Sequence, residues 1–339
     1  MIRVGVIGLG MMGRTHLECY SRLGQVKIVA VADREIERMT SASSIASNIG
    51  GVAGESFDFS KVKKYMEATQ LIEDPEVDLV DICVPTPLHV SIATSAICAG
   101  KKLLLEKPTA RTAKEALALA ELAEKYQTLA MPALCMRFWP GWTWLKQAVD
   151  ERRYGAVLSA HFSRFAKLLP GNFYRNGAAS GGAILDLHLH DTDFITWCFG
   201  MPRAVTSYGH TIVSGEVDHV LTNYEYPNSA VITSEGGWNI NPHFPFSMGF
   251  RVIFEKATAI YDINASSKLT VYEEQCEPIH IDLDHKKGYD LEIEYLLSCI
   301  QAGLQPKTVS LRDAANSLLV TEAESTSVRE HRRVSINPL

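Results

Sequence analysis

The chain of 339 residues is longer than one hydrophobic core usually organises, so we expect two domains. Hydrophobic residues make up 46% and charged residues 21% of it, which is ordinary for a globular protein and excludes a largely disordered one. The formal net charge of -6 comes from interspersed acids and bases without a basic stripe, so we expect no nucleic-acid partner.

The cysteines and the N-terminal residues indicate the compartment. Seven cysteines occur singly, with no C-x-x-C pair, which predicts buried, reduced thiols rather than a zinc or redox site. The N-terminus enters a short apolar strand directly, without the long apolar region of a signal peptide, and no run approaches about 18 apolar residues. We therefore expect a cytoplasmic protein with no membrane contact.

The first part of the chain alternates apolar runs with helical patterns. Runs rich in Val, Ile and Leu predict buried strands at residues 4–7, 27–32, 79–84, 102–105 and 129–134. Apolar residues at three- and four-residue spacing predict helices at 13–23, 36–48, 87–99 and 113–126, the last capped by Thr112 with Glu115 three residues on. This alternation predicts a doubly wound parallel sheet, a Rossmann domain over residues 1–134.

Beyond residue 134 the pattern changes. Helical patterns at residues 142–152 and 182–199 precede β-branched and aromatic runs at 220–226, 230–235, 250–254 and 269–272, separated by turn residues. We expect a large, open, mainly antiparallel sheet, in its simplest form a meander with one buried face, and helices at 291–302 and 311–330. Residues 135–339 are thus predicted to form an α+β domain for substrate binding and oligomerisation.

A complete G-x-G-x-x-G motif lies between the first strand and the first helix. Gly8 allows a tight turn, Gly10 lets a pyrophosphate approach the backbone, and Gly13 lets helix and strand pack closely. The anion would rest on free N–H groups at the helix N-terminus. Asp33, twenty residues after Gly13 at the end of the second strand, is placed to accept hydrogen bonds from a ribose 2'-OH. The expected contacts in this loop are Gly8, Gly10, Met11, Met12 and Gly13.

The residue after Asp33 bears on the choice of cofactor. Arg34 could stack on adenine or pair with a 2'-phosphate, whereas the carboxylate of Asp33 would repel that phosphate. We therefore expect NAD, with NADP as the alternative.

Two further loops follow strand ends, at the edge where open α/β sheets bind ligands. The loop 83–89 contributes Pro85, Thr86 and His89 as candidate cofactor contacts, and the next contributes Glu106 and Lys107 before Pro108. An ammonium on a turn stiffened by proline could contact a substrate oxygen near the nicotinamide. From the tripeptide alone, a surface lysine before a turn is the simpler interpretation.

The helical segment 182–199 carries the candidate acid/base group. Asp186, His190 and Asp193 fall at i, i+4 and i+7 and share one face, while His188 points away. A carboxylate one turn from an imidazole can orient it as a general base for alcohol oxidation. A metal site on His188 and His190 is disfavoured because the i, i+2 spacing separates them on a helix, so we expect no metal; a structural His190 remains the alternative.

These segments, in this order, resemble the Gfo/Idh/MocA family, named for glucose-fructose oxidoreductase, inositol dehydrogenase and a rhizopine-catabolism protein. The resemblance covers essentially the whole chain. It implies NAD(P)-dependent oxidation or reduction of a carbon–oxygen centre in a sugar, cyclitol or related polyol. It also implies that Lys107 and His190 flank the reacting oxygen while Asp186 supports them. Members with tightly held cofactor in the periplasm carry an export leader that this sequence lacks, which favours a cytoplasmic member.

The substrate contacts of that family vary, so we only nominate neighbours of the implied site. Polar side chains in loop-like aromatic settings are Arg137, Asn172, Tyr174 and His243, in addition to Asp186 and His190. Two other functions stay open: an NAD-dependent glycosidase that oxidises C3 transiently, and a non-catalytic NAD-sensing regulator. An open sheet needs its second face covered, so we expect a homodimer or homotetramer through the C-terminal sheet.

Overall fold

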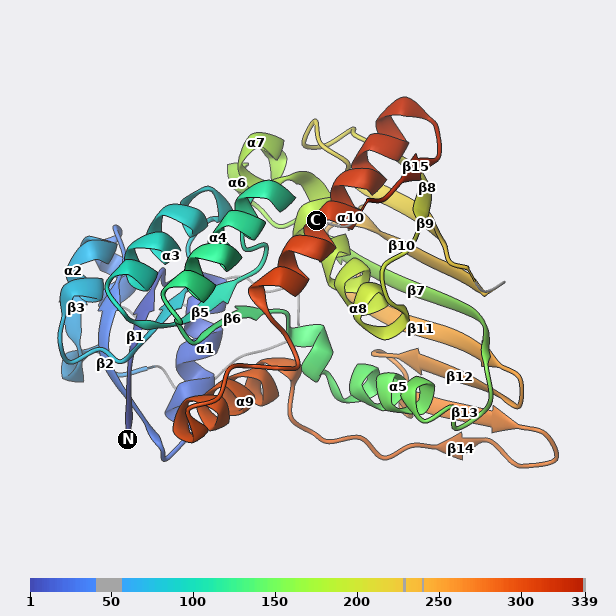
Figure 1. Cartoon of the computed structure of the whole chain (residues 1–339), viewed down its shortest axis with the longest axis horizontal. Coiled ribbons are helices and arrows are strands. Elements are labelled where there is room, and N and C mark those ends of the chain that lie inside the picture. Colours follow the sequence, from blue (N-terminus) through green and yellow to red (C-terminus); the bar gives the residue numbers. More distant parts are fainter. Residues whose placement is uncertain (41–56, 228–229, 240, 338–339) are drawn as a thin grey trace. The chain divides into compact units, whose positions relative to one another are not determined.

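The computed structural model describes residues 1–40, 57–227, 230–239 and 241–337, and in it the chain divides into two compact units (Figure 1). Unit 1 comprises Met1–Cys135 and Tyr289–Ala315, and unit 2 comprises Met136–Gly288 and Asn316–Leu339. The sequence predicted a single boundary after residue 134. The chain instead returns to unit 1, because Arg22 pairs with Asp290 and the side chain of Glu292 is buried there.

Unit 1 contains a six-stranded parallel sheet in the order β3-β2-β1-β4-β5-β6 (Figure 1). This order confirms the predicted doubly wound fold, and it reverses between β1 and β4, where ligands bind at the carboxyl ends of the strands. The strands are β1 (Ile2–Ile7), β2 (Val26–Ala32), β3 (Lys63–Tyr65), β4 (Leu79–Ile82), β5 (Lys102–Glu106) and β6 (Ala130–Ala133).

Helices cover this sheet. α3 packs beside both α2 and α4 (Figure 1), while α1 contacts β1 and β2. Thr112 accepts the Glu115 N–H in the predicted capping box that begins α4. The helices are α1 (Met11–Ser21), α2 (Ala68–Glu73), α3 (His89–Cys98), α4 (Ala113–Lys125) and α9 (Gly288–Ala302).

Two elements of unit 1 differ from the sequence-based prediction. Of the helix predicted at 36–48, the structure shows only a 3-10 turn at Ile36–Met39, and residues 41–56 lie outside the described part of the chain. β3 and α2 were not predicted. β3 is a three-residue strand at the edge of the sheet that reads Lys-Lys-Tyr and carries no apolar run.

Unit 2 is built on a nine-stranded sheet in the order β14-β13-β12-β11-β7-β10-β9-β8-β15. β7 (Val157–Lys167) lies between β10 (Val231–Asn239) and β11 (Ser247–Phe254), parallel to the first and antiparallel to the second. The mainly antiparallel sheet is confirmed, but the simple meander is wrong because the unpredicted β7 inserts between two strands consecutive in sequence. The other strands are β8 (Ala204–His210), β9 (His219–Glu225), β12 (Ala257–Asp262), β13 (Leu269–Glu273), β14 (Ile279–His280) and β15 (Val334–Ser335).

One face of the unit 2 sheet is covered by helices. The indole of Trp142, on α5, packs edge-on against Phe194, Phe250 and Tyr261 to form the aromatic centre of the core. α5 (Pro140–Asp150) and α8 (Leu189–Phe199) contact each other, and α10 (Leu311–Glu330) runs from unit 1 into unit 2. Within the described residues, none of the helices combines the length and apolarity needed to cross a membrane.

Candidate active site

The glycine loop has the geometry that the motif predicts. Gly8 follows β1 with φ of 90°, in the left-handed region, and a Cβ on Gly13 would lie 1.9 Å from the carbonyl oxygen of Gly8. A Cβ on Gly10 would meet no atom within 4 Å, so the backbone is open where α1 begins, and no side chain caps that helix end. These residues fit a pyrophosphate on the N-terminus of α1.

Asp33 joins the end of β2 to the glycine loop. Its carboxylate is 9% exposed and accepts the Leu9 N–H at 2.7 Å and the Glu35 N–H at 2.9 Å. Arg38 lies 3.7 Å from the same carboxylate, whereas Arg34 is exposed and lies 3.7 Å from Glu67. Arg38 was not predicted, because its position five residues beyond Asp33 lay within an expected helix.

Replacement of Asp33 by Ser should narrow or reverse the preference for NAD over NADP. The carboxylate that hydrogen-bonds a ribose hydroxyl also repels a 2'-phosphate, and its removal leaves Arg34 and Arg38 to attract that phosphate. The substitution also removes the hydrogen bond from the Leu9 N–H to Asp33, which affects both cofactors alike. The quantity to measure is therefore the ratio of kcat/KM with NAD to kcat/KM with NADP. Glu73→Ser, at an exposed acidic residue of α2, is the matched control. A wild-type enzyme that works better with NADP would overturn the assignment.

Lys107 follows β5 on a segment fixed by buried groups. The carboxylate of Glu106, which is 5% exposed, accepts the Lys107 N–H at 2.9 Å. His89 is 1% exposed, with Nδ1 2.7 Å from the Pro108 carbonyl oxygen and Nε2 2.7 Å from that of Val84. His89 was predicted to contact the cofactor; these contacts favour instead a structural role joining two loops.

A buried polar cluster beneath this segment was not predicted. Nδ1 of His16 lies 2.9 Å from the Asp81 carboxylate, and its Nε2 lies 3.3 Å from Glu106, an ion-pair distance. Burial alone would lower the pKa of His16, but the charge and hydrogen bond of Asp81 outweigh it and raise that pKa well above its usual value. The feature of the sequence that could have revealed this cluster is Asp81, an acidic residue inside the otherwise apolar strand β4.

The same cluster includes Cys83, whose thiol donates to Asp81 at 3.3 Å. Potential ligand atoms of His16, Asp81 and Cys83 lie within 4.8 Å of one another, a spacing that could hold a metal ion. Hydrogen bonds already join these groups, and burial raises the pKa of the thiol. The structure therefore accounts for the cluster as a hydrogen-bonded network.

Glu292, on α9, lies near this cluster without hydrogen-bond partners for either carboxylate oxygen. Burial raises the pKa of Glu292 well above its usual value; His16 opposes this shift, while the charges of Glu106 and Asp81 add to it. At a pH between the unfolded-state and folded-state pKa values, the folded protein therefore keeps a proton on Glu292 that the unfolded chain releases.

Because of this retained proton, stability should fall as pH rises from the unfolded-state pKa of Glu292 toward the raised folded-state value, by about 1.4 kcal/mol per pH unit. Glu292→Gln cannot ionise and should lack that decline. Urea unfolding midpoints at pH 5 and pH 8 should show the variant gaining on the wild type at the higher pH. Parallel pH dependence of the two proteins would contradict a protonated Glu292.

In unit 2, Asp186 and His190 are the partly exposed members of an otherwise buried stretch. Asp186 lies in a π-helical turn, Ile184–His188, that leads into α8, and His190 lies in the first turn of α8. Leu187, His188 and Leu189 between them are buried. π-Helical turns are rare and frequent at functional sites.

The nominated substrate contacts occupy different settings. Tyr174 lies close to Asp186: burial, followed by the charge of that carboxylate, raises the pKa of its phenol. Asn172 and His243 are exposed. Arg137 is only 2% exposed, and its guanidinium binds Asp193 at 2.7 and 3.0 Å, which favours a structural role.

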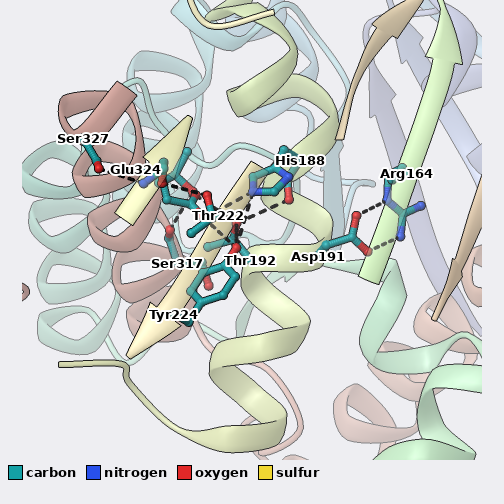
Figure 2. Close-up of polar contacts among 11 residues, drawn as sticks. Arg164, His188, Asp191, Thr192, Thr222, Tyr224, Ser317, Glu324 and Ser327 are labelled. Atoms are coloured by element: carbon teal, nitrogen blue, oxygen red, sulfur yellow. Dashed lines mark hydrogen bonds and ion pairs between the residues drawn. The ribbon is translucent and has the colours of Figure 1, made fainter. Parts of the chain in front are cut away.

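Two buried ion pairs hold α8. Besides the Arg137–Asp193 pair, Arg164 on β7 binds Asp191 through two hydrogen bonds of 2.7 and 2.9 Å (Figure 2). Asp193 also accepts a hydrogen bond from Ser317, and it is fully buried. Asp193 was predicted to share the face of Asp186 and His190, but only those two remain accessible.

His188 belongs to a separate buried network (Figure 2). Its Nε2 lies 3.2 Å from Glu324 on α10, which also accepts hydrogen bonds from Tyr224 at 2.5 Å and from Thr192 at 3.1 Å. All four side chains are buried. His188 thus joins the start of α8 to α10 and β9.

The sequence matches two family models: residues 2–134 match the oxidoreductase family with an NAD-binding Rossmann fold, and residues 142–260 match the Gfo/Idh/MocA C-terminal domain. The rhizopine catabolism protein MocA of Rhizobium meliloti is 32% identical over 201 residues, which are 58% of this chain and 57% of that protein. The scyllo-inositol 2-dehydrogenase (NAD(+)) of Bacillus subtilis (strain 168) is 24% identical and aligns over 99% of this chain and 96% of its own.

Solved structures agree with the fold. Levoglucosan dehydrogenase in complex with NADH superimposes with a TM-score of 0.85 at 19% identity, covering 100% of both chains. Because residues 2–134 match the model of that oxidoreductase family, the protein is an NAD-binding oxidoreductase. It belongs to the Gfo/Idh/MocA family, which confirms the resemblance seen in the sequence.

Proposed function

We propose that the protein oxidises a secondary hydroxyl of a cyclitol or sugar with NAD, and that His190 accepts the hydroxyl proton. The observation that carries this proposal is the exposure of Asp186 and His190 within a stretch whose other side chains are buried. Partly exposed side chains contribute less to the packing of unit 2 than buried ones would. Their exposure gives an acid/base pair access to a ligand.

The chemistry assigns one task to each group. His190 takes the proton of the hydroxyl, Asp186 orients the imidazole, and Lys107 donates a hydrogen bond to the oxygen whose charge increases as the proton leaves. NAD, when bound, supplies the hydride acceptor. Gly8, Gly10 and Gly13 with the N-terminus of α1 would hold its pyrophosphate, and Asp33 its adenosine ribose.

The relatives suggest the substrate class. Several proteins that align with nearly the full chain are inositol 2-dehydrogenases, among them that of Paenarthrobacter aurescens (strain TC1), 26% identical over 95% of this chain. We therefore take inositols as the first candidates and aldoses as the second.

A screen of inositols, aldoses and other polyols with NAD and with NADP tests the proposal through nicotinamide absorbance. We expect net cofactor reduction with at least one polyol. An NAD-dependent glycosidase would cleave a glycoside without net reduction, and an NAD-sensing regulator would bind NAD and turn over none of them; either result would contradict the proposal.

We also propose self-association through the open face of the unit 2 sheet. Register places six exposed apolar side chains there, and the pairing of such a face between subunits would bury them. Sedimentation should give the mass of a dimer or tetramer, and Leu221→Glu should lower it; a monomeric wild type would contradict this. The residues are Tyr208, Leu221, Val231, Ile253, Ile260 and Tyr272.

A cytoplasmic location completes the proposal. The seven cysteines form no disulfide in the described structure, which fits a reducing compartment.

A further inference from the structure

Two buried histidines hold the segment 106–108 from either side. His16 comes from α1 and reaches Glu106, the residue before Lys107. His89 begins α3 and reaches the carbonyl of Pro108, the residue after Lys107. Both histidines are at most 1% exposed, so water does not compete for these contacts.

The contacts act on the backbone of Lys107. The Glu106 carboxylate places one oxygen against His16 at 3.3 Å and accepts the Lys107 N–H with the other at 2.9 Å. A hydrogen bond of 2.9 Å to Asp81 fixes the opposite nitrogen of His16 and so orients the imidazole, whereas the contact between Nε2 and Glu106 is an ion pair without a hydrogen bond. In a dry interior such charged contacts are stronger than in water.

Because these contacts fix the backbone of Lys107, they also fix the position from which its side chain extends. A catalytic group must be kept within a fraction of an ångström of its productive position, and supporting residues provide that order. The proposed function gives neither His16 nor His89 a task, because the glycine loop and Asp33 would bind the cofactor and His190 would transfer the proton.

We propose that His16 and His89 are positioning residues for Lys107: His16 fixes the Glu106 carboxylate that accepts the Lys107 amide, and His89 fixes the Pro108 carbonyl. The inference rests on the proposed role of Lys107 in the reaction. A purely structural role for the two histidines makes a different prediction, because loss of packing would affect the protein whether or not Lys107 is present.

A kinetic double-mutant cycle separates the two roles. His16→Gln and His89→Gln are each made in the wild type and in Lys107→Met, with the best substrate of the screen. In the wild type each should lower kcat about tenfold, while Kd for NAD changes less than about twofold. In the Lys107→Met background neither should lower kcat further. If either histidine substitution lowered kcat in the Lys107→Met background by the same factor as in the wild type, the proposal would be overturned.

Asp74→Asn is the matched control. Asp74 is 5% exposed and, at the β3 edge of the sheet in the same unit, binds Lys63 at 3.0 Å and Tyr65 at 2.9 Å. It should lower the unfolding midpoint with kcat unchanged. If His16→Gln does not fold, Glu106→Gln tests the same arm, because it keeps the shape of the side chain and removes the charge that His16 holds.

A second readout does not depend on catalysis. Reductive methylation with 13C-formaldehyde labels lysines while retaining their charge, and the Lys107 signal is identified by its loss in Lys107→Arg. That signal should shift or broaden in His16→Gln and His89→Gln and stay in place in Asp74→Asn; an unchanged signal in either histidine variant would overturn the proposal. If Lys107→Met retains full activity, its proposed role in the reaction is wrong, and this spectrum still decides the positioning.

Discussion

Replacement of His190 by Ala should lower kcat by roughly 100-fold or more while leaving the affinity for NAD nearly unchanged. Imidazole has a reference pKa of about 6.5, so it can accept a proton near neutral pH, and in the proposed mechanism Asp186, four residues earlier in the chain, orients it. The glycine loop and Asp33, which would hold NAD, belong to unit 1 and do not include His190. Steady-state kinetics and an NAD titration by tryptophan fluorescence measure the two quantities.

His285→Ala provides the control, because His285 is an exposed histidine of the same unit and has no assigned role. It should retain wild-type kcat. If His190→Ala also retained near-normal kcat, the base would have to be another group, and Lys107 would be the first to test.

Lys107→Met should reduce kcat/KM by about 100-fold or more, the scale seen when a donor to a developing oxyanion is removed. Methionine keeps the apolar stem and removes the ammonium. In the proposed mechanism the ammonium and the base act on the same substrate oxygen; a positive charge there lowers the pKa of an imidazole, so its removal should raise the apparent pKa of the base. Because the base must be neutral to accept a proton, the rising limb of the pH–rate profile for oxidation should move to higher pH.

The exposed Lys114 on α4 supplies the matched variant: Lys114→Met should alter neither the rate nor the profile. If Lys107→Met behaved in the same way, Lys107 would be a surface lysine and the resemblance at residues 106–108 would be structural only.

Local patterns were sufficient for most of the fold. Val- and Ile-rich runs separated by amphipathic helices predicted the parallel sheet, and the Thr112 capping box marked the start of α4. Strand order in unit 2 could not be predicted, because the position of β7 between β10 and β11 depends on pairing between distant segments. The return of α9 to unit 1 likewise depends on contacts such as Arg22–Asp290, 268 residues apart.

The candidate site, like the fold, was predictable from the sequence only where it depends on residues close together in the chain. The spacing of Asp186 and His190 was visible in the sequence, and both are partly exposed. Sequence could not show that Arg137 and Asp193 bind each other, because an arginine in an aromatic loop has the same pattern whether it faces a ligand or a buried carboxylate. His16, on α1, was missed for a related reason: its partners, Asp81 and Glu106, come from two strands distant in sequence.

Isotope transfer tests directly whether NAD oxidises a carbon of a polyol. The protein is incubated with NAD and an inositol that carries deuterium on every ring carbon, or the best substrate of the screen labelled in the same way, and the reduced cofactor is analysed by mass spectrometry. We predict that the wild type forms NADH that carries one deuterium and that His190→Ala forms far less of it. Unlabelled NADH, or product formed without any net reduction of NAD, would contradict it.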